Sequence, residues 1–202
     1  MSKNNFNSRP SLKISVQPMK VRDEVLSLCR DNVEPKWKRF VRFWLNKILL
    51  KRLKLKGIGE GCQLGKNSKV ENAWLGNFSS YGPRCEFNGP LIIGDLTMLS
   101  SEVQVICQDH DHTRIDKPMR IAFPEHERPI TVVEADCWIG SRVTLMEGVR
   151  VGRGSIIGAA SVVTKSIPPY SIAVGVPAKV IKSRFTEDQI KKCDEFLYGR
   201  AL

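Results

Sequence analysis

Residues 133–169 read VEADCWIGSRVTLMEGVRVGRGSIIGAASVVTKSIPP, and an aliphatic residue stands at every sixth position. The series is Val133, Ile139, Leu145, Val151, Ile157 and Val163, and glycine follows three of these residues, at positions 140, 152 and 158. The fourth residue after an aliphatic is small or β-branched. A period of six fits neither an amphipathic helix nor a simple alternating strand. It predicts a three-sided solenoid in which each hexapeptide forms a short strand and a turn, with about eighteen residues to a coil.

The same spacing recurs earlier in the chain. One run consists of Leu75, Tyr81, Phe87, Ile93, Leu99 and Val105, and a shorter run consists of Ile58, Leu64 and Val70. The phase slips by one residue between these runs, and 27 residues without the period separate Val105 from Val133. We expect the aliphatic side chains to point inward. We expect glycine to serve the corners, because it tolerates unusual backbone dihedrals.

The stretch from Ile157 to Pro169 and the segment VGVPAKVI at 174–181 resemble the hexapeptide-repeat acyltransferases. Within that family the chain is most similar to the sugar O-acetyltransferase branch, which includes maltose, galactoside and nodulation-factor acetyltransferases. The resemblance covers residues 58–184. It implies an all-β fold, namely a left-handed parallel β-helix, that assembles as a homotrimer and uses acetyl-CoA.

The three histidines, His110, His112 and His126, all lie in the insertion that interrupts the period. Transfer of an acetyl group from a thioester to a hydroxyl needs a base, and imidazole titrates in the suitable range. The resemblance places the catalytic histidine just after the last strand before the insertion, where His110 stands. His112 is the second candidate, and we expect His126 to be a solvated loop residue.

Two polar residues are candidates for binding the acceptor. Asp109 either is solvated or orients the imidazole. Asn88 stands where many family members carry an acidic or amide residue, so it either binds a substrate hydroxyl or serves only as a turn residue. The run DHDH at 109–112 also suits a metal ion. A zinc site needs three or four ligands, however, and no thiol lies at the usual spacing, so we expect no metal site.

The resemblance also implies which residues hold acetyl-CoA. Trp138 borders the catalytic cleft, while Ser141 and Ala159 line the groove for the pantetheine arm. The positions that hold the nucleotide and its phosphates are Thr164, Lys165, Lys179 and Lys182. The family often carries arginine at the last two positions, where lysine keeps the charge but loses bidentate phosphate geometry. The alternatives are that these lysines are merely solvated and that Trp138 merely packs.

The composition predicts a cytoplasmic protein. The 202 residues include six scattered cysteines without a CxxC pair, which argues against a zinc ribbon or a disulfide framework. No apolar run approaches the roughly 20 residues that cross a bilayer. Residues 1–10 lack the apolar core of a signal peptide.

Residues 36–56 read KWKRFVRFWLNKILLKRLKLK and carry nine cations without a carboxylate. Their apolar residues recur at helical spacing, which predicts an amphipathic helix. This helix either contacts a membrane surface or docks its apolar face on the β-helix or on a trimer neighbour. No recognition motif accompanies it, so we expect no nucleic-acid binding.

Near the other end, Thr186 and Gln189 form a capping-box pattern that opens a short C-terminal helix. The expected units are an N-terminal extension (1–56), a β-helix (57–181) interrupted by a loop (106–132), and the C-terminal helix (182–202).

Two classes of function follow. The first is an acetyl-CoA-dependent O-acetyltransferase that acts on a sugar hydroxyl, in the synthesis of cell-surface polysaccharide, because such acceptors are often assembled on membrane-anchored lipids. Within this class, acetylation of an antibiotic or an amino sugar stays open. The second class is a non-catalytic trimeric scaffold or binding module, against which the histidine-bearing insertion and Lys165 argue.

Overall fold

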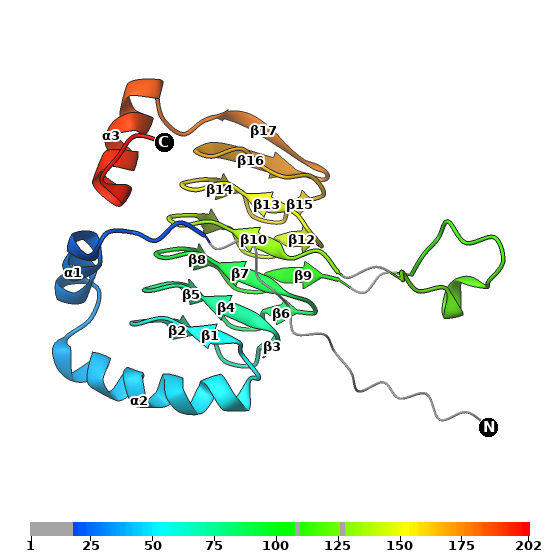
Figure 1. The fold of residues 1–202 in the computed structure, drawn as a ribbon, viewed down its shortest axis with the longest axis horizontal. Coiled ribbons are helices and arrows are strands. Elements are labelled where there is room, and N and C mark those ends of the chain that lie inside the picture. The colour runs from blue at the N-terminus through cyan, green and yellow to red at the C-terminus, as the bar shows by residue number, and fades with distance from the viewer. Residues whose placement is uncertain (1–17, 108–109, 126–127) are drawn as a thin grey trace.

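The computed structural model describes residues 18–107, 110–125 and 128–202. Its body is a three-sided solenoid, in which the chain passes repeatedly from sheet I to sheet II to sheet III (Figure 1). Sheet I consists of β1 (Gly57–Ile58), β4 (Ala73–Leu75), β7 (Leu91–Ile93), β10 (Thr131–Val133) and β13 (Arg150–Val151). Sheet II consists of β2 (Gln63–Leu64), β5 (Ser80–Tyr81), β8 (Met98–Leu99), β11 (Trp138–Ile139), β14 (Ile156–Ile157), β16 (Ser171–Gly175) and β17 (Ala178–Ser183). Sheet III consists of β3 (Lys69–Val70), β6 (Glu86–Phe87), β9 (Gln104–Ile106), β12 (Thr144–Met146) and β15 (Val162–Val163).

The period-six residues form the core, and each lies beside its counterpart in the next coil. In sheet III the paired column is Val70, Phe87, Val105, Leu145 and Val163, and none of these residues is more than 2% exposed. All pairings are parallel except that of β16 with β17. The predicted three-sided parallel β-helix is confirmed, and its handedness stays a prediction.

The glycines that follow the core residues allow close approach of neighbouring coils. A Cβ atom on Gly140 would lie 2.6 Å from the backbone nitrogen of Ala159, and one on Gly94 would lie 2.5 Å from that of Ala135. Neither glycine has a positive φ. The left-handed conformation occurs two residues later, at Leu96 and Arg142. The expectation that glycine supplies unusual dihedrals is therefore wrong at these positions, because the constraint is steric.

Two helices pack against the edge between sheets I and II. Helix α1 (Asp23–Asn32) and helix α3 (Glu187–Tyr198) bury Val25, Leu26 and Leu197 against Phe78 and Ala135 of the solenoid. The predicted capping box is confirmed, because Thr186 accepts a hydrogen bond from Gln189 N and the Gln189 side chain accepts one from Thr186 N.

Helix α2 (Lys36–Arg52) lies across the N-terminal end of the solenoid (Figure 1). Its side toward the body is largely polar: Asn46 is 7% exposed and donates to the Cys62 carbonyl oxygen at 3.1 Å. Only Leu50, in its last turn, and Leu53, just beyond, pack on the core. The interpretation that α2 docks its apolar face on its own β-helix is therefore wrong. Among the described helices, none is long and apolar enough to cross a bilayer.

Candidate functional site

The insertion that interrupts the period leaves the solenoid between β9 and β10, at the corner where sheet III passes to sheet I. Residues 110–125 of the insertion project away from the sheets and contain the short helix η1 (Met119–Ile121) (Figure 1). His110 is exposed, and its ring centroid lies 4.8 Å from that of Phe123. A backbone hydrogen bond from Asp111 N to Ala122 O, 2.9 Å long, closes the base of the loop. The imidazole is therefore held beside an aromatic ring and open to solvent.

Hydrogen bonds and ion pairs between charged side chains stabilise this loop. Arg114 donates to both carboxylate oxygens of Asp116 at 2.7 Å and to Glu125 at 3.0 Å. The hydrogen bonds that Asp116 receives from Arg114 lower its pKa to about 2. Asp111 accepts from the Thr113 hydroxyl at 2.6 Å and the Thr113 backbone N–H at 3.0 Å, which lowers its pKa. Asp111 is thus an ionised group that bonds within the loop.

The structure describes only one of the other polar candidates in the insertion. His112 is exposed, two residues beyond His110. Asp109 and His126 lie outside the described residues, so their roles stay predictions. Within the described ranges, no three side chains of the metal-ligating types gather in one place.

Asn88 lies at the same corner as the insertion, one coil earlier. It follows β6, its backbone N–H donates to Val105 O at 3.0 Å, and its side chain is exposed. The side-chain amide has no hydrogen-bond partner among the residues that the structure describes. It is therefore available to a ligand hydroxyl.

Trp138 belongs to a row of outward-facing side chains along sheet II. The strand register places Met98, Trp138, Ile156, Ile172 and Lys182 side by side on consecutive strands. Trp138 is 52% exposed, and its indole N–H donates to Ser100 Oγ at 3.4 Å. At about 4.8 Å per strand the row runs for about 19 Å. It offers a ligand an apolar path that ends at a cation.

Sequence reasoning found Trp138 and Lys182 but missed the apolar residues between and beside them. Met98 and Ile156 each directly precede a core residue, Leu99 and Ile157. Because strand residues alternate between the two faces, an apolar residue at that position must face outward. That signal was present in the sequence.

Ser141 and Ala159 stack on consecutive coils at the corner between sheets II and III. The Ser141 carbonyl accepts from Ala160 N at 2.8 Å. The backbone N–H groups of Ser141 and Ala159 have no partner within the described part of the chain, whereas those of Gly140 and Gly158 bond to the next coil. These corner N–H groups can donate to carbonyl or oxyanion oxygens.

The predicted phosphate ligands lie around the last coils. Thr164 and Lys165 follow β15, at the corner between sheets III and I, while Lys179 and Lys182 lie on β17. All four are exposed, and the three lysines form no ion pair in residues 18–107, 110–125 or 128–202. Their charge is free to meet an anionic ligand.

The chain thus carries the predicted site in two parts. His110, Asn88, Thr164 and Lys165 lie at the corner between sheets III and I. Trp138 and the lysines of β17 lie on sheet II, and Ser141 and Ala159 lie at its far corner. Sheet III separates these two parts.

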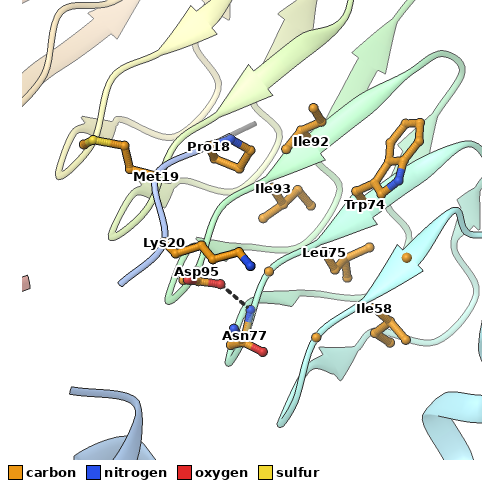
Figure 2. Close-up of a pocket in the computed structure, with 13 residues that line it drawn as sticks. Pro18, Met19, Lys20, Ile58, Trp74, Leu75, Asn77, Ile92, Ile93 and Asp95 are labelled. Atoms are coloured by element: carbon orange, nitrogen blue, oxygen red, sulfur yellow. Dashed lines mark hydrogen bonds between the residues drawn. The ribbon is translucent and has the colours of Figure 1, made fainter. Parts of the chain in front are cut away.

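A separate pocket of about 350 Å³ lies over sheet I, where Pro18, Met19 and Lys20 cross it (Figure 2). Its lining is mostly apolar and includes Trp74 and Ile92, and none of the predicted site residues lines it. Asp95 accepts from Asn77 N at 2.6 Å and from Val21 N at 3.1 Å, so its carboxylate anchors the chain that enters α1.

Residues 130–165 match the family model described as bacterial transferase hexapeptide (six repeats). A chloramphenicol acetyltransferase of Klebsiella aerogenes is 50% identical over 60 residues, which are 30% of this chain and 29% of that protein. The chain matches about a third or less of the length of this and similar curated relatives.

Solved structures match over a larger part of the chain. A maltose O-acetyltransferase from Clostridium difficile 630 superposes with a TM-score of 0.61 at 28% identity, over 81% of this chain and 84% of that one. A galactoside acetyltransferase in complex with coenzyme A has a TM-score of 0.57 at 22% identity, over 82% and 80% of the two chains, and so shares the fold. The resemblance stated from the sequence motifs is confirmed.

Proposed function

Since this chain carries the bacterial transferase hexapeptide repeat and has the fold of known acetyltransferases, we propose that it transfers an acetyl group from acetyl-CoA to a hydroxyl of a sugar. The observation that carries the proposal is the row on sheet II. It leads along Trp138, Ile156 and Ile172 to Lys182, as a ligand with an apolar arm and a phosphate-bearing end requires.

We assign acetyl-CoA to this row. Trp138 packs along the arm near the thioester, Ser141 and Ala159 line the groove, and the corner N–H group of Ala159 bonds an amide carbonyl of the arm. Thr164, Lys165, Lys179 and Lys182 hold the nucleotide and its phosphates at the C-terminal end of the solenoid. Support comes from the exposure of these lysines and from the ordinary preference of unpaired ammonium groups for phosphate.

His110 acts as the general base. Its imidazole accepts the proton of the acceptor hydroxyl while that oxygen attacks the thioester carbonyl. A backbone N–H between Trp138 and Ser141 holds the oxyanion that forms, and Ser141 supplies the unpaired one. As the carbon–sulfur bond breaks, His110 returns the proton to the thiolate, so no acyl-enzyme is needed.

The separation of the two parts calls for a homotrimer. In a ring of three copies, the corner that carries His110 on one protomer faces the sheet II row of its neighbour. Each site then takes its base, together with Thr164 and Lys165, from one chain and the sheet II row from the next. The exposed apolar side chains Met98 and Trp138, both about half exposed in the protomer, become covered in that arrangement.

The acceptor binds at the corner of His110, where Asn88 offers its amide and Asp109 is the second predicted contact. We place the acceptor among cell-surface saccharides and the enzyme in the cytoplasm. The buried cysteine thiols at Cys62, Cys85 and Cys137 suit a reducing compartment.

A second candidate acceptor is the hydroxyl of an antibiotic. It is favoured by the match to a chloramphenicol acetyltransferase, which is 50% identical over 60 residues. A screen for release of free thiol from acetyl-CoA separates the two. We expect turnover with maltose or a galactoside and none with chloramphenicol. Turnover with chloramphenicol alone favours the antibiotic. If the protein neither binds acetyl-CoA nor turns over with sugars, amino sugars or antibiotics, the result would favour the non-catalytic scaffold or binding module.

A further inference from the structure

We propose that helix α2 docks this protein on an anionic lipid bilayer, lying in the membrane surface with its outer face in the lipid. The proposal rests on the orientation of α2 against the solenoid and is independent of the acetyl-transfer reaction.

The inner face of α2 is more polar than that of an ordinary surface helix, although Leu50 in its last turn packs on the core. Asn46 faces the body and is almost fully buried, and the half-buried Arg42 bonds to Glu34 through two nitrogens. The side chain of Arg39 donates to the backbone carbonyl of Arg30. These three residues recur every three or four positions, so they mark the inner face.

The opposite face is an exposed apolar stripe. We define the α2 outer stripe as Trp37, Phe40, Val41, Trp44 and Ile48. Their spacing puts them on one side of the helix. Trp37, Phe40 and Ile48 are each about two thirds exposed, at 66%, 67% and 64%. Five large apolar side chains exposed on one side of a helix indicate an interaction site.

Cations flank the stripe on both sides. The 17 residues of α2 include seven lysines and arginines and no carboxylate. Lys47 Nζ lies 4.4 Å from the Phe43 ring centroid and 5.1 Å from that of Trp44, and Lys38 Nζ lies 5.5 Å from that of Trp37. Aromatic rings beside extended lysines are typical of helices at the headgroup boundary of a bilayer.

The positive charge of α2 favours an anionic lipid surface, rather than a second copy of the chain, as the partner of the outer stripe. Two copies that met through their outer stripes would bring together two helices with seven cations each and no acid to neutralise them. Protein interfaces tend to exclude charged groups from their core. An anionic membrane satisfies both the apolar stripe and the cations that flank it.

The position of α2 permits this contact. The helix lies at the N-terminal end of the solenoid, with its inner face on the first coil, where Asn46 bonds Cys62 (Figure 1). In the proposed trimer, with its axis along the solenoids, the three copies of α2 lie at one end. The three helices then form one basic and apolar surface that can contact a flat membrane. Simultaneous contact by three helices multiplies the affinity of each helix.

Co-sedimentation of the full-length protein with vesicles tests the proposal. We expect binding to phosphatidylcholine vesicles that contain about 30% phosphatidylglycerol. Binding to pure phosphatidylcholine should be at least about tenfold weaker, and binding to the anionic vesicles should fall in high salt. The double variant Phe40→Ser/Trp44→Ser should lower binding by at least about tenfold, and so should Lys38→Glu/Lys47→Glu.

Helix α3 supplies the matched controls. Phe196→Ser removes a half-exposed aromatic ring, and Lys191→Glu/Lys192→Glu reverses two exposed charges, both on the far end of the molecule. These variants should bind vesicles as the wild type does. Circular dichroism and thermal unfolding check that every variant is folded, and light scattering follows the oligomeric state.

Three outcomes would overturn the proposal. The first is failure of the folded wild type to bind the anionic vesicles. The second is an equal loss of binding in the α3 controls. The third is a smaller oligomer in Phe40→Ser/Trp44→Ser with unchanged vesicle binding, which would make the stripe a contact between copies. Vesicle binding without acetyl transfer would refute the proposed function and leave this inference standing.

Discussion

His110 is the residue on which the proposed chemistry depends. Removal of a general base typically costs 10² to 10⁴ in rate, roughly 3 to 5 kcal/mol of transition-state stabilisation. His110→Ala should lose at least ~99% of turnover and keep the melting temperature, because the residue lies in a loop outside the core. His112→Ala should lose much less. Comparable losses in the two variants, together with inactivation of the wild type by a chelator, would instead indicate a metal site.

Lys165 tests the donor site. Lys165→Glu replaces attraction to phosphate with repulsion, so it should raise the KM for acetyl-CoA and leave the KM for the acceptor nearly unchanged. Lys66→Glu makes the same charge change at an exposed position on the first coil and should alter neither constant. If Lys165→Glu raised the KM of both substrates equally, Lys165 would not be a contact of the nucleotide of acetyl-CoA.

Gly140 tests the steric reason for the repeat glycines. In Gly140→Ala the new methyl group meets backbone atoms of the next coil, which cannot rotate away, so we expect a loss of about 1–3 kcal/mol in stability. Gly57→Ala is the comparison, because its methyl group meets the Trp74 side chain at 3.0 Å. Thermal unfolding should show the larger decrease for Gly140→Ala, and equal decreases would argue against a backbone clash.

At the scale of the element, α3 is fastened to the solenoid by one buried carboxylate. Asp194 is 0% exposed, receives hydrogen bonds from Arg153 at 2.7 and 2.8 Å, and accepts one from the Tyr170 hydroxyl at 2.6 Å. Removal of one partner of a buried ion pair leaves the other uncompensated, at a cost of about 3–5 kcal/mol. Asp194→Ala should therefore unfold at a clearly lower temperature, whereas Glu195→Ala, exposed on the same helix, should not.

The same contact predicts acid sensitivity. Burial opposes ionisation of Asp194, but the bonds from Arg153 and Tyr170 outweigh it and hold its pKa below the usual value. A carboxyl group with a lowered pKa in the folded state stabilises the fold above its unfolded pKa of about 3.9, and that stability is lost as the pH falls through the folded pKa. The difference in melting temperature between wild type and Asp194→Ala should thus be full at pH 7 and shrink below about pH 4. A difference that stays constant with pH would contradict this assignment.

At the scale of the whole molecule, the divided site predicts trimers with shared active sites. Light scattering should give three times the 22.8 kDa of the chain, and a monomer with full activity would refute the trimer. A mixture of His110→Ala with Lys179→Glu/Lys182→Glu, unfolded and refolded together, should recover activity that neither variant has alone. Random assembly restores about a quarter of the sites if base and groove come from different chains. No recovery would place both in one chain.

The residue pattern alone predicted the solenoid, its three core columns and the cap of α3. These features are local: a period of six fixes which side chains point inward, and a capping box acts within four residues. The resemblance to the hexapeptide-repeat acyltransferases, which rests on short motifs, implied the roles of His110, Trp138 and the four phosphate candidates.

Tertiary contacts, by contrast, fix which side of α2 meets the solenoid and how the site divides between the corner of sheets III and I and the face of sheet II. A helical wheel shows that α2 has an apolar face but cannot show where that face turns, because this depends on Asn46 finding the Cys62 carbonyl and on Arg42 finding Glu34. The spacing of the glycines could not show that Gly140 lies against Ala159, a neighbour 19 residues away in the sequence. These features depend on contacts between residues far apart in the sequence. Local periodicity allows several side-chain arrangements, and the packing of one coil on the next selects one of them.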